Sequence, residues 1–385
     1  MAENAERPLR VGLLGIDRAG RGFGARAHVP GIKHAPGVEL VAVCTRREES
    51  AREAAETHDI PRYYVGLDQM LEDPDIDLIN IAVRVRSHYP EAWKALQSGK
   101  MVYCEWPLGL NSYEARTLSK LAEKKRLITG VGTQGRFGPG ILYLKDLIEE
   151  GYIGEPLFFH MTHFLPRFEV RSTHWWSAMG VYEEHSGALG VATGHATDTL
   201  RSVLGEVASL SGYSEVLYPE DTYVDTGEPF EWTADDTVAF LARMESGVTG
   251  TVHISNVTTQ QMGFSLHVFG KEGQLSATAP YYVSYSPVTV QGLQKHSERA
   301  ESSYEHVELS PKEMEVLPTP ERYYWVPDLE EGSTGYNLGQ AMVAMREAWL
   351  RGERFPVDFR AGYRMHHLIE SIKKSWAERR WVDLI

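Results

Sequence analysis

Short apolar runs alternate with helical patterns along the first third of the chain, and this alternation restricts the possible folds more than any other feature. The apolar runs are nearly continuous, as expected of strands that are buried on both faces. They cover residues 9–15, 38–44, 77–83, 101–104 and 127–131, with helical patterns at 22–34, 48–57, 89–97 and 112–124. Such alternation is typical of parallel βαβ units with right-handed crossovers. We therefore predict an α/β domain with a doubly wound parallel sheet over residues 1–134.

The pattern changes after about residue 135. A helix is predicted at 138–150, followed by β-rich runs at 156–165, 237–243, 249–254, 264–268 and 273–278, with a helical segment near 195–204. Residues 280–335 are polar and predict long loops with edge strands, and two amphipathic helices, 337–351 and 360–379, close the chain. Alternating apolar and polar residues are typical of an antiparallel sheet with one solvated face. We predict a second, α+β domain over residues 135–385, built on an open, mostly antiparallel sheet.

Charge and cysteine content exclude several classes of protein. The 53 acidic residues outnumber the 39 Lys and Arg, which gives a formal net charge of −14 and disfavours binding to nucleic acids or anionic membranes. The two cysteines, Cys44 and Cys104, end apolar runs and indicate neither a disulfide scaffold nor a cysteine-based zinc site. No apolar stretch suits a membrane span, and residues 1–10 lack a signal-peptide core. We expect a cytoplasmic protein that forms homo-oligomers, dimers or tetramers, because an open sheet leaves a flat face to cover.

A glycine-rich turn follows the first apolar run. A dinucleotide-binding turn requires the pattern G-x-G-x-x-G between a strand and a helix, so that the backbone can approach the pyrophosphate. The candidate cofactor contacts in this turn are Gly15, Ile16, Asp17, Arg18, Gly20 and Arg21. Asp17 replaces the middle glycine, although Gly22 and Gly24 could allow a longer, displaced loop. The alternative is a glycine-rich turn without a ligand.

The end of the second apolar run bears on the choice of cofactor. Thr45, Arg46 and Arg47 stand where an NAD-selective site usually carries Asp or Glu for the ribose 2′-hydroxyl. Because Arg accommodates a 2′-phosphate, these residues favour NADP, with NAD still possible. A solvated basic helix start is the alternative interpretation.

The segment Glu105-Trp106-Pro107 resembles the E-K-P motif of the glucose–fructose oxidoreductase/inositol dehydrogenase (Gfo/Idh/MocA) family. The resemblance covers almost the whole chain and includes residues 132–137, 149–156 and 187–198. It implies an N-terminal Rossmann domain, a C-terminal open-sheet domain and a substrate bound between them against the nicotinamide.

The family's catalytic trio consists of the Lys of E-K-P, a carboxylate or amide, and a His four residues further on. Here Trp106 takes the place of the Lys and Val191 that of the acidic residue, so only His195 matches. These departures are similar to a subgroup that includes the fungal galactose-pathway repressor, which binds NADP and acts as a sensor.

The same resemblance implies further cofactor contacts. They are Val83, His88, Glu105, Trp106, Pro107 and Gln134. His88 could equally be a structural residue at a helix start, and Gln134 could equally stabilise its loop. The Lys-Pro bond of the family is typically cis, so Trp106-Pro107 is a candidate cis peptide that would aim the indole toward the nicotinamide pocket.

Five of the 15 histidines fall within residues 160–195: His160, His163, His174, His185 and His195. Because His titrates near neutrality, His195 is the first candidate general acid/base, supported by Tyr182, His185 and His163. Each of them could instead be an ordinary hydrogen-bonded residue. A zinc site is disfavoured because His160 and His163 would point to opposite faces of a strand.

Aromatic side chains concentrate near these histidines and suit stacking on a sugar or cyclitol ring. The predicted substrate contacts are Trp106, His163, His174, Trp175, Trp176, Tyr182 and His195. Core packing or a subunit interface is the alternative for the tryptophans.

Three functional hypotheses follow from these residues. The first is an NAD(P)-dependent oxidoreductase that transfers a hydride from a hydroxyl-bearing carbon of a sugar, sugar derivative or cyclitol, with His195 as the proton carrier. The second is a noncatalytic NADP-binding sensor. The third is elimination or epimerisation assisted by transient oxidation with a retained cofactor.

Overall fold

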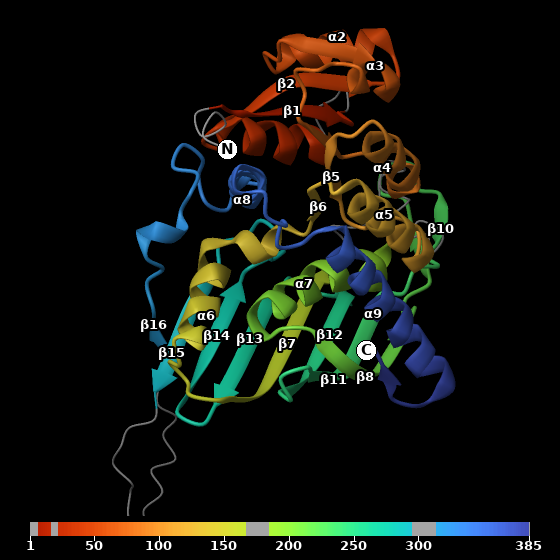
Figure 1. Ribbon diagram of the computed structural model, residues 1–385. Coiled ribbons are helices and arrows are strands. Elements are labelled where there is room, and N and C mark those ends of the chain that lie inside the picture. The colour runs from red at the N-terminus through yellow and green to blue at the C-terminus, as the bar shows by residue number, and fades with distance from the viewer. Residues whose placement is uncertain (1–6, 17–21, 167–184, 295–312, 385) are drawn as a thin grey trace, which may run out of the picture.

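The computed structural model describes residues 7–16, 22–166, 185–294 and 313–384, and it contains two large sheets (Figure 1). Asp17, Arg18, Gly20, Arg21, His174, Trp175, Trp176 and Tyr182 lie outside the described residues.

The first sheet has six parallel strands in the order β3-β2-β1-β4-β5-β6. The strands are β1 (Leu9–Leu14), β2 (Val38–Thr45), β3 (Arg62–Val65), β4 (Leu78–Ile81), β5 (Met101–Glu105) and β6 (Thr129–Gly132). The chain order reverses between β1 and β4, which is where ligands bind doubly wound sheets. The predicted Rossmann-type α/β fold is confirmed.

Helices connect these strands. They are the π turn η2 (Gly24–His28), α1 (Val29–His34), α2 (Glu48–Thr57), α3 (Leu67–Leu71), the 3-10 turn η3 (Val85–Ser87), α4 (His88–Gln97) and α5 (Ser112–Lys125). The single helix predicted at residues 22–34 is therefore a π turn followed by a short α-helix. β3 and α3 were not predicted, because β3 alternates between half-buried and exposed residues and α3 has only five residues.

The second sheet has nine strands in the order β16-β15-β14-β13-β7-β12-β11-β8-β17. Its strands are β7 (Pro156–Pro166), β8 (Val207–Glu215), β11 (Thr237–Met244), β12 (Thr249–Thr258), β13 (Gly263–Gly270), β14 (Gly273–Ala279), β15 (Thr289–Gln294), β16 (Glu315–Val316) and β17 (Val382–Asp383). All neighbours pair antiparallel except β7 and β12. The prediction of a mostly antiparallel sheet is confirmed. A separate hairpin pairs β9 (Glu220–Thr222) with β10 (Pro229–Glu231).

Helices lie along one face of this sheet in Figure 1. They are α6 (Pro139–Glu149), α7 (Thr193–Leu204) and α9 (Phe359–Glu378); the 3-10 turn η4 (Gln134–Phe137) precedes α6 and the π turn η8 (Ala188–Ala192) precedes α7. The remaining long helix, α8 (Tyr336–Arg351), packs against α1 of the first sheet. Among the described residues, no helix is both long and apolar enough to cross a membrane.

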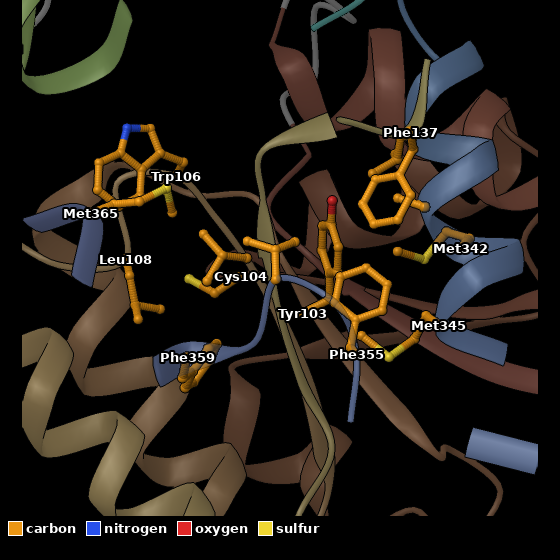
Figure 2. Packing of buried hydrophobic residues seen from close by; sticks show 14 of the residues in the cluster. Tyr103, Cys104, Trp106, Leu108, Phe137, Met342, Met345, Phe355, Phe359 and Met365 are labelled. Carbon is orange, nitrogen blue, oxygen red and sulfur yellow. The ribbon is translucent and has the colours of Figure 1, made fainter. Parts of the chain in front are cut away.

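The two halves of the chain share one core. Tyr103 of β5 lies edge-on to Phe355 at 6.2 Å, and Phe137 stacks on the same ring at 5.3 Å. Figure 2 shows Met342 and Met345 of α8 beside these rings. The backbone N–H of Val131 in β6 donates to the carbonyl of Val357 at 2.9 Å, so the segment before α9 covers the edge of the first sheet. The carboxyl ends of the parallel strands are thereby fixed against the second half of the chain.

Candidate active site

Two glycines shape the turn after β1. Gly15 has φ +104°, and a Cβ on it would lie 2.4 Å from the carbonyl oxygen of Ala82. A Cβ on Gly24 would lie 2.0 Å from the carbonyl oxygen of Gly15, so η2 packs directly on the turn. Close helix–strand packing is the role of the third glycine in a dinucleotide-binding turn. Because Gly24 has this position, the loop is longer than the standard pattern, as Gly22 and Gly24 had suggested.

The carboxyl end of β2 carries the predicted selectivity residues. Thr45 is buried, and its hydroxyl donates to the carbonyl of Arg47 at 2.8 Å. The side chains of Arg46 and Arg47 are exposed. The site therefore presents two guanidinium groups, and no carboxylate occupies position 45.

A buried carboxylate lies at the end of β5. Oε1 of Glu105 accepts a hydrogen bond from Nε2 of Gln134 at 2.6 Å and lies 3.0 Å from Nε2 of His28. A Cβ on Gly132 would fall 2.4 Å from the same oxygen, so a larger residue there would displace the carboxylate from this position. Oε1 of Gln134 is buried and has no hydrogen-bond partner among the described residues. Gln134 is only 1% exposed, so this amide oxygen is enclosed within the protein.

His88 joins two loops at the edge of the first sheet. It begins α4 and is buried, with Nδ1 2.6 Å from the carbonyl of Pro107 and Nε2 3.0 Å from the carbonyl of Val83. Burial lowers the pKa of its imidazole. These contacts match the structural interpretation of His88.

The peptide Trp106-Pro107 is cis, as predicted.

Trp106 is 5% exposed and belongs to the core. Its N–H donates to the carbonyl of Gly190 at 3.0 Å, and its ring lies 4.6 Å from that of His366. Figure 2 shows the indole beside Met365 of α9. The geometry agrees with the core-packing interpretation, because so little of the indole is left to stack on a sugar.

His195 lies on α7 and is 7% exposed. Its Nδ1 is 2.8 Å from Oγ of Ser284, and its ring lies edge-on to Tyr282 at 5.3 Å. Burial lowers the pKa of His195 to about 4, against the opposing effect of the Glu105 and Asp198 charges. The imidazole is therefore neutral at pH 7, and Nε2 is the nitrogen not engaged by Ser284.

The other two described candidates, His163 and His185, contact different aromatic side chains. His163 is fully buried, with its ring 4.8 Å from Tyr282, and burial lowers its pKa to about 3. His185 has φ +51°, lies 6.4 Å from Trp106 and 4.7 Å from His366, and burial lowers its pKa to about 4. Each histidine is therefore neutral at pH 7.

A carboxylate close to His195 in sequence has a structural role. Asp198 is fully buried and accepts hydrogen bonds from Arg136 at 2.6 and 2.7 Å and from Thr133 at 2.7 Å. Its oxygens hold the loop after β6 against α7. Nowhere in the described ranges does a group of three or more His, Cys, Asp or Glu side chains suit a metal ion.

Sequence reasoning missed four polar residues of this region: His28, Tyr282, Ser284 and His366. The tyrosine-rich segment 281–285 is a sequence signal that could have drawn attention to Tyr282 and Ser284. His28 and His366 fall within helical patterns, where nothing distinguishes them from surface residues.

Comparison with known proteins decides the family. Residues 9–133 match the family model for "Oxidoreductase family, NAD-binding Rossmann fold", and residues 141–276 match the GFO/IDH/MocA C-terminal domain. The chain belongs to the Gfo/Idh/MocA family. The resemblance of the E-W-P segment and of residues 187–198 is thereby confirmed at the level of the family.

Individual relatives are distant. The chain is 27% identical to scyllo-inositol 2-dehydrogenase (NAD(+)) of Bacillus subtilis over 277 residues. This aligned region covers 70% of this chain and 74% of that protein. A levoglucosan dehydrogenase in complex with NADH and L-sorbose superimposes with a TM-score of 0.81 at 22% identity, covering 98% of this chain and 99% of that one. A super-repressor mutant of Gal80p from Saccharomyces cerevisiae superimposes with a TM-score of 0.82 at 18% identity, covering 98% of each. These two solved structures show that the fold is shared.

Proposed function

We propose that this Gfo/Idh/MocA protein is an oxidoreductase that prefers NADP to NAD and acts on a hydroxyl group of a sugar, sugar derivative or cyclitol. The observation that carries the proposal is the pairing of His195 with Ser284, which engages Nδ1 and leaves Nε2 for a substrate.

We also propose that the boundary between the cofactor domain and the substrate domain lies after residue 134.

The residues present fit a dinucleotide. The close approach of Gly24 to Gly15 forms a turn in which backbone and ligand can come close, and Arg46 and Arg47 are placed for a 2′-phosphate. When bound, the nicotinamide would accept or return a hydride.

His195 handles the proton. In the tautomer in which Nδ1–H donates to Oγ of Ser284, the lone pair of Nε2 is free to take the proton of a substrate hydroxyl, and we assign this tautomer to the active protein. The charges of Glu105 and Asp198 favour the imidazolium that forms. The proton can return to the substrate oxygen when the reaction runs in reverse.

The missing Lys must be replaced by other groups. The Trp106 N–H is already bonded to the carbonyl of Gly190, and an indole cannot shuttle a proton. We therefore assign proton transfer to His195 alone.

The test is spectroscopic. Purified protein is mixed with NADP or NAD and a panel of D-glucose, D-galactose, D-xylose and myo-inositol, and the reduced-nicotinamide absorbance is followed. We expect turnover with at least one compound and a loss of about a hundredfold or more in His195→Ala. Unchanged turnover in that variant would remove His195 from the proton-carrier role.

A sensor is the second candidate function. It is favoured because Trp106 stands in place of the family's Lys and Val191 in place of its acidic residue. A sensor would bind cofactor and sugar without any change in the nicotinamide spectrum. The same panel therefore separates the two functions.

We further propose that a second copy of the chain covers the open face of the nine-stranded sheet. The strand registers place three rows of side chains on this face: Arg243–Thr249–Phe158–Phe269, Leu241–Thr251–His160–His267 and Ala239–His253–Thr162–Ser265. All are exposed or half-exposed, and Arg243 alone among these twelve carries a permanent charge. Depletion of charge is typical of the core of a subunit interface. Phe158, 48% exposed and stacked on Phe269 at 4.4 Å, supplies apolar surface for such a contact.

A further inference from the structure

The segment 280–286 after β14 brings two side chains to His195. Ser284 is hydrogen-bonded to the imidazole, and the ring of Tyr282 lies 5.3 Å from that of His195 and 4.8 Å from that of His163. Nδ2 of Asn337 in α8 donates to the carbonyl of Ser284 at 3.0 Å. The segment is thus anchored to a long helix and holds Tyr282 in a fixed place beside the proposed proton carrier.

The hydroxyl of Tyr282 is buried and has no hydrogen-bond partner among the described residues. Leaving a buried hydroxyl without a partner costs roughly 1–3 kcal/mol, so such groups usually meet a ligand or water. Tyr282 as a whole is half-buried, so part of the residue remains accessible.

The surroundings of the Tyr282 phenol also set its protonation state. Burial raises the pKa of Tyr282 well above its ordinary value, with smaller contributions from Tyr285 and from the charge of Glu105. The phenol therefore stays protonated at neutral pH and can only donate or accept a hydrogen bond.

We propose that Tyr282 binds the reacting oxygen of the substrate and supplies the hydrogen bond that the family's Lys would provide. This inference rests on the proposed function. In the oxidative direction a bound NADP would accept the C–H electron pair as hydride, the O–H proton would move to Nε2 of His195, and the substrate carbon would become a carbonyl. The Tyr282 O–H keeps its proton throughout and donates to the substrate oxygen as negative charge develops there.

The experiment compares Tyr282→Phe with Tyr285→Phe. Tyr285 stacks on Tyr282 at 5.6 Å, so the control removes a hydroxyl from the same ring cluster without touching His195 contacts. kcat and KM are measured with the best compound of the panel, and calorimetry measures binding of each panel compound to the NADPH-loaded protein.

We expect kcat to fall about tenfold to a hundredfold in Tyr282→Phe, with NADPH affinity unchanged and Tyr285→Phe close to wild type. Activity within twofold of wild type in Tyr282→Phe would overturn the inference and leave the proposed function intact. If the wild type binds a sugar without turnover, a tenfold weaker affinity in Tyr282→Phe supports the contact, and unchanged affinity overturns it. A wild type that neither binds nor converts any panel compound overturns both proposals.

Discussion

Gly194 lies directly against the indole of Trp106. A Cβ built on Gly194 would fall 2.1 Å from Nε1 of the tryptophan, and the same nitrogen donates to the carbonyl of Gly190 at 3.0 Å. The large side chain that replaces the family's Lys is thus accommodated by a glycine in the first turn of α7. Because His195 is the next residue, this contact also fixes the position of the proposed proton carrier.

Gly194→Ala is expected to destabilise the protein, although alanine normally favours a helix over glycine by about 1 kcal/mol. The added methyl would overlap the indole, and such overpacking costs roughly 1–3 kcal/mol. Urea unfolding measures the difference. The double variant Gly194→Ala with Trp106→Leu should lose less than the sum of the two single changes, and strict additivity would contradict the contact.

Acid should destabilise the fold through its buried histidines. The pKa of His163 is lowered to about 3, so below pH 6.5 the unfolded chain takes up a proton that the folded chain does not. The free energy of unfolding therefore falls as the pH drops from about 6.5 toward 3, by about 2 kcal/mol for this residue at pH 5.

His163→Phe should remove that share of the pH dependence. We expect the loss of stability between about pH 7 and pH 5 to be smaller by about 2 kcal/mol, as measured by urea unfolding at each pH. His160→Phe, on the exposed face of the same strand, is the matched control. Parallel stability curves for wild type and His163→Phe would contradict the prediction.

Arg46 and Arg47 should determine the preference for NADP. Replacing both with Ala is expected to weaken NADP binding by about tenfold or more and leave NAD binding nearly unchanged, since only NADP carries the 2′-phosphate. Calorimetry with each cofactor measures the ratio. Arg52→Ala removes an exposed charge from the neighbouring helix α2 and should change neither affinity. An equal loss for both cofactors would argue against a 2′-phosphate contact.

The open sheet face should be the subunit interface. Phe158→Glu introduces a charge beside Phe269 on this face and is expected to reduce the mass in solution to that of one chain, as measured by light scattering. Tyr113→Glu, on α5 and 75% exposed, should leave the assembly unchanged. A wild type that is already monomeric would refute the interface.

The parallel sheet and most helices could be predicted because buried strands leave continuous apolar runs and amphipathic helices leave a clear period. β3 escaped because its Tyr63 and Val65 are exposed and Arg62 and Tyr64 are only half-buried. The longer phosphate-binding turn was foreseen as one option, but only the packing of Gly24 on Gly15 identifies the glycine at which the helix approaches the turn.

The site was harder to predict than the fold. His195 could be found because the family motif and the histidine density coincide there. Tyr282 and Ser284 were missed because they come from a loop more than eighty residues away, and the tyrosine-rich run 281–285 does not by itself place that loop beside His195. Trp106 was expected at the pocket, and its burial against Gly194 and His366 could be seen only once the helices were packed.

The most direct test of the account is a calorimetric titration of the folded protein with NADP and then NAD. We expect one binding site per chain and tighter binding of NADP. Folded protein that takes up neither coenzyme would contradict the assignment of the first domain and every role built on it.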